Sequence, residues 1–263
     1  MNRSLHSNII GKGKPLLILH GFLGMSDNWK SLGMKYAEKG LQVHLIDQRN
    51  HGKSFHSEDF DYDILAEDLK HYIQQYKLED AIIMGHSMGG KTAMQFAFTY
   101  PDLMYKMIVA DIAPKYYPPH HQHIIDGLNQ LDFDRIKSRG QADTELSTYI
   151  PDFGIRQFLL KNLYWVQKGK LGFRFNLKVL GDKMGEIGDD ISPSDIYKGP
   201  TLFLKGDKSA YIIPSDSDAI QRHFPIAKIE TIDNAGHWLH AENPVQFFDK
   251  TMDFINLPGL YFT

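Results

Sequence analysis

The stretch that decides the fold is Ala81-Ile82-Ile83-Met84-Gly85-His86-Ser87-Met88-Gly89-Gly90. It joins a short apolar run, typical of a buried strand, to a helix-like segment over 88–100 that stops before a proline. At the junction the residues fit the pattern G-x-S-x-G, whose glycines permit a sharp turn that exposes the serine hydroxyl. Ser87 is therefore a candidate nucleophile. The alternative interpretation is a glycine-rich helix start that Ser87 caps.

Outward from this junction, strand-like and helix-like segments alternate along the chain. Apolar runs that predict buried strands lie at 16–20, 41–47, 81–85, 107–111, 201–204 and 228–232, and amphipathic stretches that predict helices lie at 27–39, 62–76, 88–100 and 244–255. Such alternation is typical of βαβ units. We expect an α/β fold in which helices cover both faces of a mostly parallel central sheet.

The alternation is interrupted between the fourth and fifth predicted strands. Residues 114–198 contain no strong strand pattern, and helical patterns lie around 124–131, 134–140 and 154–163. We expect a core formed by residues 1–113 and 199–263, with 114–198 inserted as a helical lid over the carboxyl edge of the sheet.

Composition excludes several classes of protein. The 263 residues include 29 Lys and Arg against 32 Asp and Glu, without clustered basic residues, which argues against nucleic acid or a membrane as partner. The absence of cysteine excludes a thiol nucleophile and thiolate metal sites. No run of about 18 apolar residues and no signal-like start is present. We expect a soluble, unprocessed, cytoplasmic chain that acts on a small molecule and needs no metal or cofactor.

A serine hydroxyl needs a base to become a nucleophile, and His237 is the candidate. It lies in Asn234-Ala235-Gly236-His237-Trp238, just after the last predicted strand, where the chain order serine, acid, histidine would place it. His240 is the rival, although it falls at the start of a helix-like segment.

Two aspartates are candidates for the acid that orients this histidine. Asp111 ends the fourth predicted strand, so its carboxylate would emerge beside Ser87. Asp207 follows the fifth strand in Gly206-Asp207-Lys208-Ser209. We favour Asp111, with Ser209 hydrogen-bonding nearby, and keep Asp207 as the alternative acid.

Two backbone N–H groups are candidates for an oxyanion hole. One belongs to Met88, directly after the candidate nucleophile, and the other to Phe22 in the glycine-containing turn His20-Gly21-Phe22-Leu23-Gly24. His20 precedes this turn and is expected to support it rather than react.

With these residues assigned, the chain resembles the α/β-hydrolase superfamily, and more closely the bacterial YbfF-type esterases and their mitochondrial relatives in animals. The resemblance spans nearly the whole chain and rests on Asp47-Gln48-Arg49-Asn50-His51-Gly52-Lys53-Ser54, Gly85-His86-Ser87-Met88-Gly89-Gly90-Lys91, Asp111-Ile112-Ala113-Pro114, Gln157-Phe158-Leu159-Leu160-Lys161-Asn162-Leu163, Arg174-Phe175-Asn176 and Ala235-Gly236-His237-Trp238. It implies an α/β-hydrolase fold and the hydrolysis of carboxylic esters or thioesters. The substrates that it suggests carry acyl chains and include acyl-CoA-like ligands. It also implies a serine at the position after the fifth strand and an acid at the end of the fourth, in agreement with Ser209 and Asp111.

Several other side chains are candidates for substrate binding. Lys91 could meet an anionic acyl or CoA group, Arg49 could lie near the site, and the aromatic residues Tyr116, Phe158 and Trp165 of the predicted lid could line an acyl pocket. The run His120-His121-Gln122-His123 invites a metal interpretation, but a solvated lid segment fits its spacing better.

Two other functions use the same pattern. The serine and histidine could serve a C–C bond hydrolase or an elimination-type synthase on this scaffold. A non-catalytic receptor could retain the same three residues.

Overall fold

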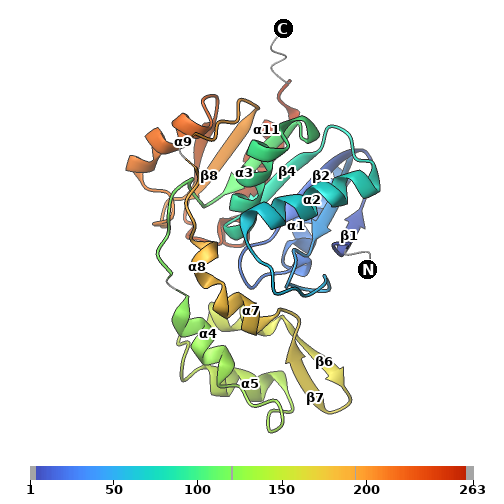
Figure 1. The fold of residues 1–263 in the computed structure, drawn as a ribbon, viewed down its shortest axis with the longest axis vertical. Coiled ribbons are helices and arrows are strands. Elements are labelled where there is room, and N and C mark those ends of the chain that lie inside the picture. The colour runs from blue at the N-terminus through green and yellow to red at the C-terminus, as the bar shows by residue number, and fades with distance from the viewer. Residues whose placement is uncertain (1–3, 120, 193, 259–263) are drawn as a thin grey trace.

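A computed structural model of the chain describes residues 4–119, 121–192 and 194–258. Its centre is a seven-stranded sheet in the order β1-β3-β2-β4-β5-β8-β9 (Figure 1). The strands are β1 (Ser7–Ile10), β2 (Lys14–Leu19), β3 (Leu41–Ile46), β4 (Ile82–His86), β5 (Lys106–Ala110), β8 (Thr201–Gly206) and β9 (Lys228–Ile232). All neighbours pair in parallel except β1, which runs antiparallel to β3. The predicted mostly parallel sheet is confirmed.

The sheet is buried on both faces because its strand residues alternate between two apolar clusters. On β2, Leu17 and Leu19 face one cluster, whereas Leu16 and Ile18 face the other. The first face is covered by α2 (Tyr62–Tyr76), α3 (Met88–Thr99) and α9 (Ser217–His223), and the second by α1 (Lys30–Glu38) and α11 (Pro244–Asn256). The prediction of helices on both faces is therefore confirmed.

Between β5 and β8 the chain leaves the sheet and forms the lower part of the molecule in Figure 1. This segment contains α4 (Gln122–Asn129), α5 (Arg139–Leu146), α6 (Phe153–Leu160), α7 (Leu177–Asp182) and α8 (Met184–Ile187), together with the antiparallel strands β6 (Leu163–Gln167) and β7 (Lys170–Phe173). A third apolar cluster holds these elements together and reaches Leu23 and Met88 of the sheet edge.

The strand pair β6 and β7 corrects the expectation that this segment is purely helical. Its strands are short and largely exposed at Trp165 and Val166, so they lack the apolar run that marks a buried strand. The helix expected at 134–140 instead spans Arg139–Leu146, because the Ser138 side chain accepts a hydrogen bond from the N–H of Gln141 and so fixes the helix start.

Parallel pairing brings the carboxyl ends of the strands to one edge of the sheet. The remaining short helical elements of the chain are η1 (Ser26–Trp29), η2 (Pro101–Leu103), η3 (Pro214–Asp216) and α10 (Leu239–Glu242). Phe22 follows β2, Ser87 follows β4, Asp111 follows β5, and His237 follows β9. The segment between β5 and β8 leaves from this same edge. Within the described residues, no helix is both long and apolar enough to span a membrane.

Candidate active site

Ser87 stands at a strained turn between β4 and α3. Its φ of 53° and ψ of −119° lie outside the regions that a serine prefers, at a cost of about 1–3 kcal/mol. The turn is held because the glycines around it allow very close packing: a Cβ at Gly89 would lie 2.4 Å from the Leu19 carbonyl oxygen. The hydroxyl is thereby presented at a cavity wall with only 9% of the residue exposed.

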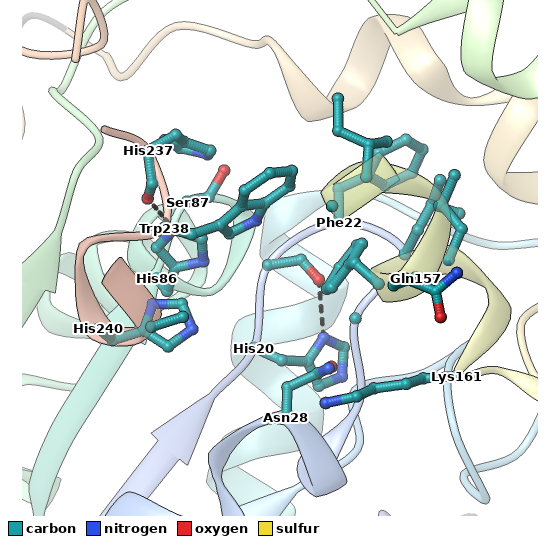
Figure 2. Close-up of a pocket in the computed structure, with 18 of the residues that line it drawn as sticks. His20, Phe22, Asn28, His86, Ser87, Gln157, Lys161, His237, Trp238 and His240 are labelled. Atoms are coloured by element: carbon teal, nitrogen blue, oxygen red, sulfur yellow. Dashed lines mark hydrogen bonds between the residues drawn. The ribbon is translucent and has the colours of Figure 1, made fainter. Parts of the chain in front are cut away.

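His237 is oriented by Asp111. The Nδ1–H group donates to Oδ2 of Asp111 over 2.8 Å, which leaves Nε2 as the basic nitrogen. Figure 2 shows the His237 ring beside Ser87 at the same end of the cavity that both residues line. The structure thus brings together the three residues that the chain order predicted.

The Asp111 carboxylate is fully buried and accepts hydrogen bonds from three donors. Besides His237, it accepts the Ser209 hydroxyl and, over 3.2 Å, the backbone N–H of Gly206. Burial raises the pKa of Asp111 to about 7, and the bonds from Ser209 and Gly206 act against that rise. Asp111 also has a positive φ of 52°, so the backbone is strained at the acid as well as at Ser87.

Asp207, the alternative acid, makes a different contact. Its Oδ1 accepts the backbone N–H of Ala235 over 2.9 Å, which pins the loop that carries His237. Hydrogen bonds from the backbone of Asn234 and Ala235 lower its pKa. The carboxylate that meets the His237 ring is that of Asp111.

Neighbouring aromatic rings hold the histidine in place. Tyr211 stacks on His237 with ring centroids 3.7 Å apart, and the Nε2–H of His86 donates to the His237 carbonyl over 2.8 Å. His240, the rival base, stacks on Trp29 at 4.0 Å, and burial lowers its pKa well below the usual value. Sequence reasoning missed Tyr211 and His86 as supports, although His86 occupies the variable position before Ser87.

The candidate oxyanion donors flank Ser87. Among the described residues, the backbone N–H groups of Phe22 and Met88 donate to no protein acceptor. The turn approaches the serine closely, since a Cβ at Gly21 would lie 3.3 Å from the Cβ of Ser87. His20 supports this turn as expected, because its Nε2 accepts the N–H of Gln48 over 3.0 Å. Two N–H groups therefore lie at the turns beside the hydroxyl without internal partners.

A cavity of about 560 Å³ opens beside these residues, and most of its lining area is apolar. Phe22, Phe158 and Trp238 are among its walls, and the polar side chains of Asn28 and Lys161 also line it (Figure 2). Phe158 packs 5.6 Å from the Trp238 ring, so its expected place in an apolar pocket agrees with the geometry.

Four other substrate-binding candidates lie elsewhere, and we correct them. Lys91 is buried, and its ammonium donates to the carbonyls of Lys115, Gly188 and Asp189. Arg49 forms a buried ion pair with Asp68, in which Arg49 Nε lies 2.6 Å from Asp68 Oδ2. Tyr116 and Trp165 are more than half exposed and line neither described cavity.

The histidine run of the predicted lid lies partly at the large cavity. His120 lies outside the described residues. His121 and His123 both line this cavity; His121 is partly buried and its ring stacks on Phe22 with centroids 5.6 Å apart, whereas His123 is exposed. Within the described part of the chain, no three His, Asp or Glu residues group as metal ligands would.

Comparison with known proteins agrees with this architecture. A family model described as the alpha/beta hydrolase fold matches residues 14–149. The mouse sn-1-specific diacylglycerol lipase ABHD11 is 38% identical over 247 residues, covering 91% of this chain and 80% of the relative. Esterase YbfF of Escherichia coli is 32% identical over 232 residues, covering 88% of each. A solved marine microorganism esterase superposes with a TM-score of 0.93 at 42% identity, covering 96% of this chain and all of that one. The resemblance to YbfF-type esterases is confirmed.

Proposed function

This chain belongs to the alpha/beta hydrolase family, and from that premise we propose that it is a serine hydrolase of carboxylic esters or thioesters, working through an acyl-enzyme on Ser87. The observation that carries the proposal is the hydrogen bond from His237 to buried Asp111, at the wall where strained Ser87 presents its hydroxyl. The names of the relatives, which include esterases and a lipase, support ester cleavage.

In the first half-reaction, Ser87 Oγ attacks the carbonyl carbon while Nε2 of His237 takes the hydroxyl proton. Asp111 stabilises the resulting imidazolium, and Ser209 and the Gly206 N–H hold the carboxylate in position. The N–H groups of Phe22 and Met88 bind the oxyanion, each typically contributing about 3–4 kcal/mol. His237 then gives its proton to the leaving alcohol or thiol, and the acyl group remains on Ser87.

In the second half-reaction, water replaces the departed alcohol or thiol. Nε2 of His237 takes a proton from this water, the hydroxide attacks the acyl carbon, and the proton returns to Ser87 Oγ as the free acid leaves. We assign residues 114–198 as the lid, because this segment supplies Phe158 and much of the wall that keeps bulk water from the intermediate.

The test is covalent labelling combined with turnover. We expect a fluorophosphonate to label Ser87 and Ser87→Ala to lower kcat on p-nitrophenyl butyrate by a factor of about 10⁴ to 10⁶. Ser217→Ala is the matched control, because Ser217 is exposed on α9 and its hydroxyl bonds only the Pro214 carbonyl. Full turnover by Ser87→Ala, with an intact circular dichroism spectrum, would refute the assignment.

A further inference from the structure

Ser87 lies between two cavities of very different size. The large one of about 560 Å³ has a small neighbour of about 30 Å³, and Phe22, Ser87 and His121 line both. The residues that differ are informative: among the described residues, His237 lines only the large cavity and Met88 only the small one. A substrate centred on Ser87 thus has two unequal spaces available.

The proton transfer decides which part of the substrate enters which space. The leaving oxygen or sulfur must receive its proton from His237, so it has to lie in the cavity that His237 lines. That cavity is the large one. The oxyanion points to the N–H groups of Phe22 and Met88, and the acyl chain, as the last substituent of the tetrahedral carbon, is directed into the small cavity.

The second cavity is small, and apolar side chains form much of its wall. At about 10–15 Å³ for each water-sized group, 30 Å³ accommodates roughly two or three such groups beyond the carbonyl. Met88, Ile112 and Met184 are buried parts of its wall, and Ile187 completes one side. The backbone at Gly188 is held by two hydrogen bonds, one from the Tyr117 N–H over 2.8 Å and one from Lys91 Nζ over 3.3 Å. These two bonds hold the wall in place at Gly188.

We propose that the small cavity is the acyl site and the large cavity is the leaving-group site. The substrates are then esters or thioesters that join an acid of about two to four carbons to a bulky alcohol or thiol. This assignment rests on the proposed serine hydrolase function, and it adds which side of the scissile bond is restricted in size.

The first measurement is kcat/KM along two substrate series. In p-nitrophenyl esters of acids from two to ten carbons, we expect a fall of at least about tenfold between four and eight carbons, because a packed site resists groups larger than the space it offers. In acetate esters of alcohols of increasing length, followed by acid release, we expect no such fall.

The second measurement uses two matched isoleucine variants of the lid. Ile187→Ala on α8 enlarges the small cavity, and we expect its acyl optimum to move to longer acids by about two carbons. Ile155→Ala on α6 removes the same atoms from the large cavity, and we expect its acyl optimum to stay unchanged. Both side chains are only partly buried, and Ile187→Val, which should move the optimum in the same direction by less, serves if the alanine variant does not fold.

The outcomes separate the two proposals. An octanoate preference in the unmodified enzyme, or a longer acyl optimum in Ile155→Ala but not in Ile187→Ala, would overturn the acyl-site assignment while leaving a serine hydrolase. No turnover of any ester, together with no fluorophosphonate label on Ser87, would overturn the proposed function and this assignment with it.

Discussion

Asp111 shows how much a single side chain in this site depends on its neighbours. Full burial favours the neutral acid and raises the pKa to about 7, yet the proposed mechanism needs the carboxylate to stabilise an imidazolium. The Ser209 hydroxyl and the Gly206 N–H oppose that rise by donating to the charged form. We therefore propose that Ser209 is a positioning residue, which acts through its hydrogen bond to Asp111 rather than on the substrate.

The choice between the two candidate acids can be measured directly. We expect Asp111→Asn to lower kcat by a factor of about 10³ to 10⁴, because an amide no longer fixes the productive tautomer of His237. Asp207→Asn is the matched control and should change kcat by less than about twofold, since that carboxylate binds the Ala235 N–H and not the ring. The larger loss in stopped-flow turnover of p-nitrophenyl acetate should fall on Asp111→Asn; the reverse ranking would remove Asp111 from the mechanism.

At the residue scale, the sequence predicted the position of those candidate residues that lie at strand ends. Ser87, Asp111 and His237 sit at strand ends, and a parallel sheet necessarily brings such ends together. It did not predict that Lys91 and Arg49 have buried partners, because these partners are distant in the chain. Asp68 is 19 residues from Arg49, and Gly188 is 97 residues from Lys91. Long-range pairing of a charge leaves no local pattern.

At the scale of elements, Lys91 joins α3, the helix that follows the candidate nucleophile, to both ends of the proposed lid. Its ammonium, on α3, donates to the Lys115 carbonyl over 2.7 Å where the lid begins, and to the carbonyls of Gly188 and Asp189 near where it ends. Burial lowers its pKa to about 8. The Lys91 ammonium thus binds two backbone segments, at Lys115 and at Gly188, that are more than 70 residues apart in the chain.

Removing this cation should weaken the protein as a whole. We expect Lys91→Met to lower the free energy of unfolding by about 1–3 kcal/mol, because buried carbonyls lose their donor, and the melting temperature by about 2–4 °C for each kcal/mol. Lys168→Met, on the exposed turn between β6 and β7, is the control and should shift the melting temperature by less than about 2 °C. Equal melting temperatures for the two variants in scanning calorimetry would contradict this role.

The elements that the sequence predicted best are the five central strands, which are largely buried. The sixth apolar run became β9, an edge strand of mostly intermediate exposure, whereas β1, at the other edge, was missed. The strands β6 and β7 were missed for the same reason. Edge and surface strands keep polar side chains on their open face, so hydrophobic patterning marks them poorly.

At the scale of the whole molecule, burial favours the neutral form of several imidazoles in the folded chain. Burial lowers the pKa of five histidines: His20, His44, His51, His86 and His240. For His44 the value is about 4, and for His86 about 3. In an unfolded chain the same groups would titrate near 6.5.

Stability should therefore decline as the solution is acidified. Below pH 6.5 the unfolded chain takes up protons that the folded chain does not, so each such imidazole lowers the free energy of unfolding by up to about 1.4 kcal/mol per pH unit, until its folded pKa is reached. For His44 the window runs from about 6.5 down to about 4. We expect urea unfolding to show this decline, with little change from this source between pH 7 and 8.

A variant isolates the contribution of one group. His44 bonds the Tyr72 hydroxyl over 2.7 Å and lines neither described cavity. His44→Gln should therefore flatten the slope below pH 6.5 by up to about 1.4 kcal/mol per pH unit, whatever its effect at pH 7. His71→Gln is the control, because the His71 side chain is 59% exposed and is not taken out of water by folding. An unchanged slope in His44→Gln would show that this imidazole is not neutral in the folded protein.

The pairing of Asp111 with Ser209 bears on how such a site changes over generations. The two residues lie on neighbouring strand ends, and the serine already touches the carboxylate that serves His237. A descendant with aspartate at both positions would hold two carboxyl groups that share one proton, an arrangement that proteins tolerate. Loss of the older carboxyl group would then leave the newer one in charge of the histidine. By this route the position of the acid would change from one strand end to the next, and every intermediate sequence would keep a carboxylate beside the imidazole.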